Sequence, residues 1–516
     1  MQKDLLFGID VGSSNIKSVL FDKECNVLAR EIEGVEIILP KPGWAEYDPD
    51  QWWEHVKTTL KRCLLKTKVN PDRIAGVGVS SLGCCVVPLD KAGNHVYNAI
   101  PWSDLRAYEE VNFLERHCKD LILKNSGNIP TGLSATPHLM WLKNKMPQVY
   151  KKIYKYLEAS GFIVQRLTRE FTLDFSMASA LDYGTDVKAF GYDEKLINLM
   201  GLDIEKYAKL HKNKDIVGTV TSESALGTGL TKGTPVFNAG LDIVTAALAG
   251  GAIFPGQGFY SMGSASNMMI VTEQVVPSPY LTSIKHIIND DIDLVFGSQG
   301  AAGFSIKWFL EQFGDIEKKA SELFNRNINP FELLSMEASK SLPGAGGLIY
   351  LPYLFGKFHP VFDPFCRGTF VGISPTTKKA DFIRAIMEGA TFNMYETMES
   401  ALDAGINLKE IITSGGPTNS DIWCQIIADI TGKKIITIDA PEASPLGNAI
   451  LAGVGTGLFS DFETAVSNLI KEKKNYHPDM KNHALYDELF EVYKNVYASL
   501  KDNYKIMAEI KENFDL

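Results

Sequence analysis

Apolar and polar positions near the start of the chain alternate with short clusters of glycine and hydroxyl residues. Apolar β-forming residues at 5–11 and 16–21 flank the cluster Gly12-Ser13-Ser14-Asn15, which predicts a strand, a tight turn and a second strand. A third strand over about residues 27–38 extends this meander. A P-loop or a dinucleotide-binding fingerprint would place a helix directly after the glycine turn. The pattern therefore predicts a hairpin and argues against those two motifs.

Helical periodicity follows the hairpin. Asp48 and Pro49 predict the N-cap and first position of a helix, on which Trp52, Val56, Leu60 and Leu64 share one face. Residues 74–81 and 84–89 then predict two buried strands. Strands, a helix and further strands in this order are typical of an α/β domain.

The same pattern begins again in the middle of the chain. Residues 235–242 predict a strand that continues into a helix over 244–251, and residues 258–271 predict two strands around Gly263-Ser264-Ala265. Two such turns, half a chain apart, predict a duplicated architecture with one nucleotide cleft between the halves. A boundary near residue 250 divides the chain into an N-terminal domain over 1–248 and a C-terminal domain over 249–505.

The C-terminal half adds one more glycine turn. A strand over 411–414 ends at Gly415-Gly416, and a helix over about 420–431 follows. A later helix over 444–452 is rich in small residues, which permit close approach of another backbone.

Length and composition limit the classes of function. A chain of 516 residues is too long for one hydrophobic core. Its 52 basic and 62 acidic residues give a net charge of −10, so neither nucleic acid nor an anionic membrane is an expected partner. The seven cysteines show neither zinc-ligand spacing nor a disulfide framework. With no secretory signal and no apolar run of about 20 residues, we expect a cytoplasmic protein; a homodimer is left open.

Glycine turns that carry hydroxyls suit phosphate, because backbone N–H groups can converge on an anion where no Cβ intervenes. A single such turn is more often a plain hairpin, but two matching turns favour phosphate binding. Asp10, at the end of the first strand, is placed to hold Mg²⁺. Phosphoryl transfer to an alcohol also needs a base. Asp242 is the best candidate by position, although its place at a helix start fits an N-cap equally well.

These motifs resemble the FGGY family of carbohydrate kinases, a branch of the hexokinase, actin and heat-shock ATPase superfamily, over nearly the whole chain. The most specific match is the C-domain signature Gly368-Thr369-Phe370-Val371-Gly372-Ile373 followed, after seven residues, by 381–388. The other matching segments are 8–14, 43–49, 102–106, 240–242, 263–266 and 415–429.

The resemblance implies an α/β fold of two ribonuclease-H-like (actin-like) domains with a nucleotide and substrate cleft between them. It implies ATP-dependent transfer of phosphate to a hydroxyl of a small sugar or sugar alcohol, with ATP and Mg²⁺ as cofactors and domain closure that excludes water. Asp242 then becomes the general base and Asp10 the metal-binding residue. The implied ATP-binding residues are Gly12, Ser13, Ser14, Lys17, Ser264, Gly303, Lys307, Gly415, Gly416 and Ser420. The implied substrate-binding residues are Leu82, Gly83, Cys84, Trp102, Asp104 and Asp242.

The chain departs from the family pattern where the acceptor is chosen. Xylulose kinases have Gly-Gln-Met-His-Gly after the 74–80 strand and glycerol kinases have Arg-Glu nearby, whereas this chain has Ser81-Leu82-Gly83-Cys84-Cys85. A site without those polar groups would leave the hydroxyls of the usual substrates unpaired. His138 likewise stands where the family has Lys. The common xylulose and glycerol assignments therefore lose weight. A pentulose, a tetritol or a pentitol is the working prediction for the acceptor.

Two other functions remain open from the sequence. One is an ATPase that acts on a protein partner, as in the chaperone and actin branches. The other is a catalytically altered family member that serves as an ATP-dependent regulatory or ligand-sensing protein. The C-domain signature and the pair Asp10 and Asp242 favour the active kinase.

Overall fold

The computed structural model describes residues 3–289, 291–324, 328–440 and 442–514. The chain forms two compact units, and both draw on several stretches of sequence. Unit 1 comprises Met1–Ile253, Val271–Leu294 and Glu442–Ile470; unit 2 comprises Phe254–Ile270, Val295–Pro441 and Lys471–Leu516. The boundary predicted after residue 248 lies close to the first of these divisions. The predicted C-terminal domain was continuous over 249–505, whereas the chain returns to unit 1 twice within that range.

Unit 1 is built around a mixed sheet. Its strands, in spatial order, are β12 (Gly218–Thr219), β13 (Pro235–Leu241), β4 (Ile74–Ser81), β1 (Leu5–Val11), β2 (Asn15–Asp22) and β3 (Val27–Gly34). β1 runs antiparallel to β2 and parallel to β4, and β13 runs parallel to β4. The carboxyl ends of β1, β4 and β13 therefore lie at the same edge of the sheet.

Unit 2 repeats this arrangement. The strands that lie mainly in it follow the order β17 (Asp293–Gln299), β15 (Ser266–Thr272), β14 (Gln257–Met262), β20 (Glu410–Gly415), β21 (Lys434–Ile438) and β22 (Glu472–Tyr476). β14 pairs antiparallel with β15 and parallel with β20, as β1 does with β2 and β4. The predicted duplication and the α/β class are thus confirmed.

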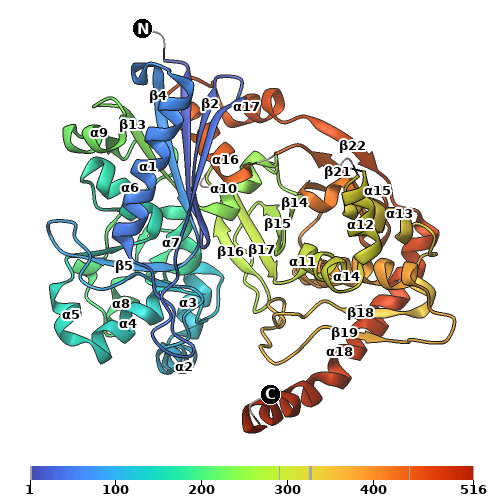
Figure 1. The fold of residues 1–516 in the computed structure, drawn as a ribbon. Helices are drawn as coiled ribbons and strands as arrows, with labels where there is room; N and C mark the ends of the chain where they lie inside the picture. The colour runs from blue at the N-terminus through green and yellow to red at the C-terminus, as the bar shows by residue number, and fades with distance from the viewer. Residues whose placement is uncertain (1–2, 290, 325–327, 441, 515–516) are drawn as a thin grey trace. The chain divides into compact units, whose positions relative to one another are not determined.

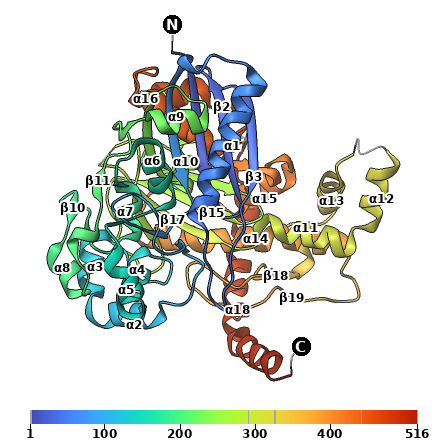
Figure 2. The ribbon, with the colours of Figure 1, turned by 60° about the vertical axis from the view of Figure 1, so that its left-hand side comes forward.

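Further helices and strands complete the two units (Figure 1). In unit 1 they are α1 (Pro49–Thr67), β5 (Cys85–Leu89), β6 (Ile100–Pro101), α2 (Tyr108–His117), α3 (Lys119–Ser126), α4 (Ala135–Lys145), α5 (Pro147–Lys152), β7 (Lys155–Leu157), α6 (Ala159–Thr168), β8 (Thr172–Asp174), α7 (Phe175–Leu181), β9 (Thr185–Asp186), β10 (Gly191–Tyr192), α8 (Glu194–Leu199), β11 (Lys209–His211), α9 (Ser222–Thr228), α10 (Asp242–Ala249), β16 (Thr282–Lys285), α16 (Ala443–Gly455) and α17 (Phe462–Leu469). In unit 2 they are α11 (Ala302–Phe313), α12 (Asp315–Leu323), α13 (Pro330–Ala338), β18 (Ile349–Leu351), β19 (Thr369–Val371), α14 (Lys379–Asp403), the 3₁₀ helix η4 (Gly416–Asn419), α15 (Asp421–Thr431) and α18 (Met480–Phe514). Figure 2 shows the last turns of α18 projecting past β18 and β19.

The helix predicted from residue 48 is α1, and it covers one face of the unit 1 sheet. Asp48 is its N-cap and accepts a hydrogen bond from the backbone N–H of Asp50, with Pro49 in the first turn. Trp52, Val56 and Leu60 are fully buried against the sheet. Burial of each such side chain contributes about 1.5–3 kcal/mol, so the apolar stripe holds α1 in place. Among the described residues, no helix is both long and apolar enough to cross a membrane.

The opposite face of the sheet is covered by α16 and α10, which lie on the side of the strands away from α1 in Figure 1. The approach of α16 to β1 is very close. A Cβ on Gly8 would lie 2.0 Å from the carbonyl oxygen of Pro445, and a Cβ on Gly78 would lie 2.3 Å from that of Asn448. Both obstacles are backbone atoms, which cannot turn away as a side chain can. Glycine in β1 and β4 is therefore a condition for seating α16.

This packing predicts the effect of a single methyl group. Gly8→Ala should destabilise the protein by about 1–3 kcal/mol or more, because overpacking against backbone forces a shift of α16. Gly34→Ala is the matched control, since a Cβ on Gly34 at the end of β3 meets no atom within 4 Å. Urea unfolding followed by circular dichroism measures both. Equal midpoints for the two variants would contradict the close approach.

Candidate active site

The first predicted turn is presented at the surface of unit 1. Its two ends are closed by a 3.0 Å hydrogen bond from the N–H of Gly12 to the carbonyl of Asn15. Ser13 and Ser14 are exposed at its tip, while the flanking strands are buried. The hydroxyl of Tyr47 donates to the carbonyl of Ser13 at 2.9 Å. The Tyr47 hydroxyl thus holds the backbone of the turn, and the hydroxyls of Ser13 and Ser14 are not buried in the core.

Lys17 lies opposite Asp10 in the β1–β2 register. Its Nζ is 3.6 Å from Oε2 of Glu442, and the Nε of Arg30 lies 2.8 Å from Oε1 of the same carboxylate. Arg30 can therefore neutralise Glu442 when Lys17 takes another anion.

Asp10 is buried at the carboxyl end of β1, with 8% of its surface exposed. Its Oδ1 accepts hydrogen bonds from Ser80 Oγ at 3.1 Å and Ser444 Oγ at 3.2 Å. Its Oδ2 faces the turn, 3.9 Å from the place a Cβ of Gly12 would occupy. Burial raises the pKa of this carboxyl group, against the lowering effects of Lys17 and the two hydroxyls. Ser80 and Ser444 were not among the predicted site residues; they lie in the strand predicted over 74–81 and in the helix predicted over 444–452.

Asp242 is the first residue of α10, and the N-cap is Leu241. Its Oδ1 accepts a 2.7 Å hydrogen bond from the N–H of Ile243. Burial, and next the negative charge of Asp10, raise the pKa of Asp242 well above its usual range, while the N–H of Ile243 and Lys17 lower it. Such a carboxylate is a stronger base than an ordinary surface aspartate. The structure thus places Asp242 beyond the N-cap position that the sequence left as an alternative.

The segment predicted to contact the acceptor begins beside the first turn, because the N–H of Leu82 donates to the carbonyl of Val11 at 2.9 Å. Leu82 and Cys84 are buried, with 3% and 2% of their surfaces exposed. Burial raises the pKa of the Cys84 thiol far above its usual range, as expected of a small apolar side chain rather than a reactive one. Gly83 is half-buried, and Trp102 is half-buried at the edge of the core. This segment therefore offers backbone and apolar surface.

Asp104 is fully engaged inside unit 1. Its carboxylate accepts hydrogen bonds from the N–H of Ala45 and from the backbone and guanidinium of Arg106. Burial raises its pKa, but hydrogen bonds from His138 and Arg106 outweigh that effect and hold it at about 2. The Arg106 guanidinium stacks 3.8 Å above the ring of Trp44. Asp104 thus joins the 102–106 loop to the 43–47 loop, and His138 belongs to the same cluster.

Glu158, which sequence analysis did not single out, supports the acceptor segment from behind. Its Oε2 accepts a 2.8 Å hydrogen bond from the N–H of Cys85. Burial, with smaller contributions from Asp174 and Asp182 and against the hydrogen bond from Cys85, raises the pKa of Glu158 to about 8. The carboxyl group is therefore protonated at neutral pH.

Unit 2 brings three of its predicted ATP-binding residues together. Ser264 is exposed at the tip of the β14–β15 turn. The N–H of Gly303 donates to the carbonyl of Gly263 at 3.0 Å, and the N–H of Phe304 donates to the carbonyl of Ser264 at 3.1 Å, so the start of α11 lies against this turn. Gly415 has a φ of 117°, and a Cβ there would lie 1.9 Å from the carbonyl oxygen of Met262. The ends of β14 and β20 and the start of α11 thus converge.

The other predicted ATP-binding residues of unit 2 differ in whether their polar groups are already engaged within the protein. Gly416 opens η4, and a Cβ there would meet no atom within 4 Å. Ser420 is the N-cap of α15, and its hydroxyl accepts from the N–H of Trp423 at 3.4 Å. Lys307 is exposed on α11, with its Nζ 3.8 Å from Glu311. Gly416 therefore offers open backbone, whereas the Ser420 hydroxyl already serves the helix.

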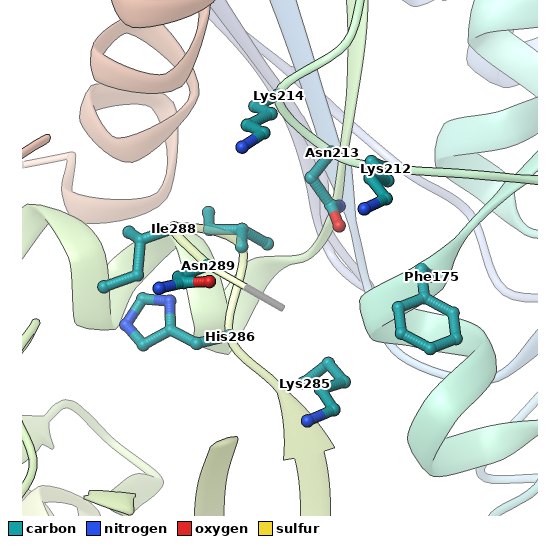
Figure 3. A pocket seen from close by; sticks show the side chains of 9 residues that line it. Phe175, Lys212, Asn213, Lys214, Lys285, His286, Ile288 and Asn289 are labelled. Carbon is teal, nitrogen blue, oxygen red and sulfur yellow. The ribbon is translucent and has the colours of Figure 1, made fainter. Parts of the chain in front are cut away.

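A small pocket in unit 1 contains none of the predicted site residues (Figure 3). Lys212, Asn213 and Lys214 face the 285–289 segment across it. The Nζ of Lys285 pairs with Asp293 at 2.9 Å. His286 Nε2 lies 3.0 Å from the carbonyl of Ala252, just after α10, and burial lowers its pKa to about 4. The neutral ring therefore donates to that carbonyl and supports the far end of the helix that begins with Asp242.

Comparisons with known proteins show what this chain is similar to. Residues 5–249 match the model of the FGGY family of carbohydrate kinases, N-terminal domain, and residues 258–456 match that of the C-terminal domain. The chain is 30% identical over 505 residues to a xylulose kinase of Staphylococcus epidermidis, covering 97% of this chain and 98% of that protein. It is 25% identical over 515 residues to a gluconokinase of Bacillus subtilis, covering 98% of each. The crystal structure of xylulose kinase from Rhodospirillum rubrum superimposes with a TM-score of 0.87 at 26% identity, covering 97% of this chain and all of that one.

The buried carboxyl group of Glu158 makes stability depend on pH. The folded state keeps its proton up to about pH 8, whereas an unfolded glutamate loses it near pH 4.3. Stability from this group is therefore fully present at low pH and falls as the pH rises between these values, by at most about 1.4 kcal/mol per unit. Glu158→Gln lacks this loss. We subtract the unfolding free energy of Glu158→Gln from that of wild type, and we expect this difference to decrease from pH 5 to pH 8. The same difference for Glu194→Gln, a substitution at an exposed glutamate, should stay constant. A flat Glu158→Gln difference would show an ordinary carboxyl pKa.

Proposed function

The chain belongs to the FGGY family of carbohydrate kinases, and from that premise we propose a reaction for its site. The γ-phosphate of ATP is transferred to a hydroxyl of a small sugar or sugar alcohol, with Asp242 as general base. The observation that carries this proposal is the environment of Asp242, a carboxylate at the start of α10 whose pKa is raised by burial and by Asp10.

In the proposed reaction, the acceptor hydroxyl gives its proton to Asp242. Oδ1 already holds the N–H of Ile243, so Oδ2 is the oxygen that takes the proton. The acceptor oxygen forms a bond to the γ-phosphorus while the bond from that phosphorus to the β-phosphate oxygen breaks and ADP leaves. A base whose pKa lies near the working pH is both ionised before the reaction and able to hold the proton after it.

The ATP-binding residues proposed for unit 1 are Gly12, Ser13, Ser14 and Lys17, and for unit 2 they are Ser264, Gly303, Lys307, Gly415, Gly416 and Ser420. Exposed turn hydroxyls and converging N–H groups support phosphate binding in both units. Lys17 would exchange Glu442 for a phosphate, because Arg30 remains on that carboxylate.

Asp10 suits Mg²⁺ by the chemistry of its donor atoms. Magnesium prefers carboxylate oxygens and keeps several of its waters. The hydroxyls of Ser80 and Ser444 occupy Oδ1, which leaves Oδ2, on the side of the phosphate turn, to hold the ion or one of its waters. When bound, the ion neutralises charge on the transferring phosphate.

For the acceptor, we propose a pentulose, a tetritol or a pentitol. The relatives named above include a xylulose kinase, so a pentulose acceptor has precedent in the family. Leu82, Gly83, Cys84 and Trp102 would shape the acceptor site through backbone and apolar surface, and Asp104 would support it from behind. Because the donor is ATP, we place the reaction in the cytoplasm. The regulatory alternative is not favoured, since the relatives named above are all kinases.

Replacement of the base tests the reaction directly. Asp242→Asn should lower acceptor-dependent ADP release by about 10²–10⁴-fold, the usual contribution of a general base, while ATP still binds. Asp120→Asn, at an exposed aspartate of α3, is the control and should match wild type. A coupled ADP-release assay measures turnover, and calorimetry measures ATP binding. Undiminished acceptor-dependent turnover in Asp242→Asn would sink the base assignment.

A panel of ketoses, aldoses and polyols tests the acceptor class. We expect kcat/KM to be highest for a pentulose, a tetritol or a pentitol, because segment 81–85 lacks side chains that pair additional hydroxyls. The same ADP-release assay ranks the compounds. If no compound of the panel stimulates ADP release, the result would favour the regulatory alternative.

A further inference from the structure

A web of hydroxyl groups joins Asp10 to the helix that begins with Asp242, and Ser444 lies at its centre. Ser444 is in the first turn of α16. Its Oγ is 2.7 Å from Ser80 Oγ, 3.2 Å from Asp10 Oδ1 and 2.9 Å from Thr245 Oγ1. All four residues belong to unit 1.

The web continues into α10. Thr245 Oγ1 donates to the backbone carbonyl of Asp242 at 2.9 Å. One side of Ser444 thus contacts the carboxylate at the end of β1, and the other side contacts the first turn of α10.

The backbone around Ser444 is held by close packing. A Cβ on Gly447 would lie 2.0 Å from the carbonyl oxygen of Thr245, so α16 and α10 touch through their backbones. The amide of Asn448 donates to the carbonyl of Ile9 at 2.7 Å and to Ser80 Oγ at 2.8 Å. The first two turns of α16 are therefore fixed to β1 and to α10, which gives Ser444 a defined position between them.

A hydroxyl is suited to this place because it can donate one hydrogen bond and accept two. Ser444 donates its one proton to the Asp10 carboxylate, and it accepts from Thr245 Oγ1 when the Thr245 proton turns from the carbonyl of Asp242 to Ser444. Satisfied networks of this kind in a buried setting hold their members more rigidly than separate pairs do. An alanine at 444 would keep the helix but cut both connections at once.

We propose that Ser444 is a positioning residue for phosphoryl transfer, whose hydroxyl fixes the Asp10 carboxylate relative to the first turn of α10 and so to Asp242. The inference rests on the roles proposed above for these two aspartates. Transfer requires its groups in line and in contact, and a displacement of about 1 Å can cost about 10²-fold in rate. The loss of Ser444 removes neither carboxylate; it removes one hydrogen bond from Asp10 and the connection of Asp10 to α10.

The test begins with Ser444→Ala in the full-length protein. We expect kcat to fall about 10–100-fold, with KM for ATP and for the best acceptor within about twofold of wild type. Ser444→Thr, which keeps the hydroxyl, should restore most of the rate. The matched control is Thr456→Val at the other end of α16, where the hydroxyl bonds only to backbone carbonyls of its own helix; it should leave kcat unchanged.

A second readout does not depend on turnover. Binding of Mn²⁺ in the presence of ADP, followed by electron paramagnetic resonance, should be several-fold weaker in Ser444→Ala than in Thr456→Val. Thr245→Val cuts only the connection to α10, so it should lower kcat and leave Mn²⁺ binding near wild type. The double variant should lose less than the product of the two single losses, because both belong to one web.

Three outcomes would overturn the inference. They are an unchanged kcat in folded Ser444→Ala, independent effects of the Ser444 and Thr245 variants, and a Thr456→Val defect as large as that of Ser444→Ala. Should Ser444→Ala not fold, Thr245→Val and Ser444→Thr decide the question alone, since a kcat equal to wild type in Thr245→Val also overturns it. Failure of the proposed function would appear separately, as acceptor-dependent turnover that survives in Asp242→Asn.

Discussion

Unit 1 must hold two buried carboxylates that influence each other electrostatically. Asp10 and Asp242 repel each other, and burial raises the pKa of both. An arrangement of this kind costs folding free energy, and it persists only where surrounding groups hold it. The surrounding groups here are the hydroxyls on Asp10, the N–H of Ile243 and the glycine contacts that seat α16. Burial and this repulsion, which together raise the pKa of Asp242, support the roles proposed for Asp242 as a base and for Asp10 as a Mg²⁺-binding residue.

The two turns share a backbone arrangement because the architecture is duplicated, but they differ in the side chains beside them. In the aligned positions of β1 and β14, Asp10 corresponds to Ser261 and its cross-strand partner Lys17 corresponds to Asn267. The first copy therefore carries a charged pair, and the second carries uncharged polar groups in the same place. Both turns can present hydroxyls and N–H groups, and of the two aligned positions only that in unit 1 carries a carboxylate.

Local features were predictable from the sequence, and long-range ones were not. The hairpins around Ser13 and Ser264 and the start of α1 follow from turn chemistry and periodicity within a few residues. Ser80 and Ser444 could not be found in this way, because they are 364 positions apart in the chain and only the folded structure puts their hydroxyls 2.7 Å apart. The engagement of Asp104 was missed for a similar reason, since Ala45 is 59 residues away. Glu158 gave no signal at all, because a glutamate before a helix is usually exposed and here it is buried under Cys85.

The division of unit 1 into separated stretches of sequence has a consequence for its synthesis. The helix that completes the environment of Asp10, α16, lies at residues 443–455, after most of unit 2. While the ribosome makes the first half of the chain, β1 and β4 have no α16 to cover their glycine-rich face. An N-terminal domain usually folds first and alone. Unit 1 cannot complete its folding in this order, because it lacks α16. Unit 1 can reach its final form only when about nine-tenths of the chain has been made, so a nascent chain must keep that apolar face from aggregating until its own distant helix arrives.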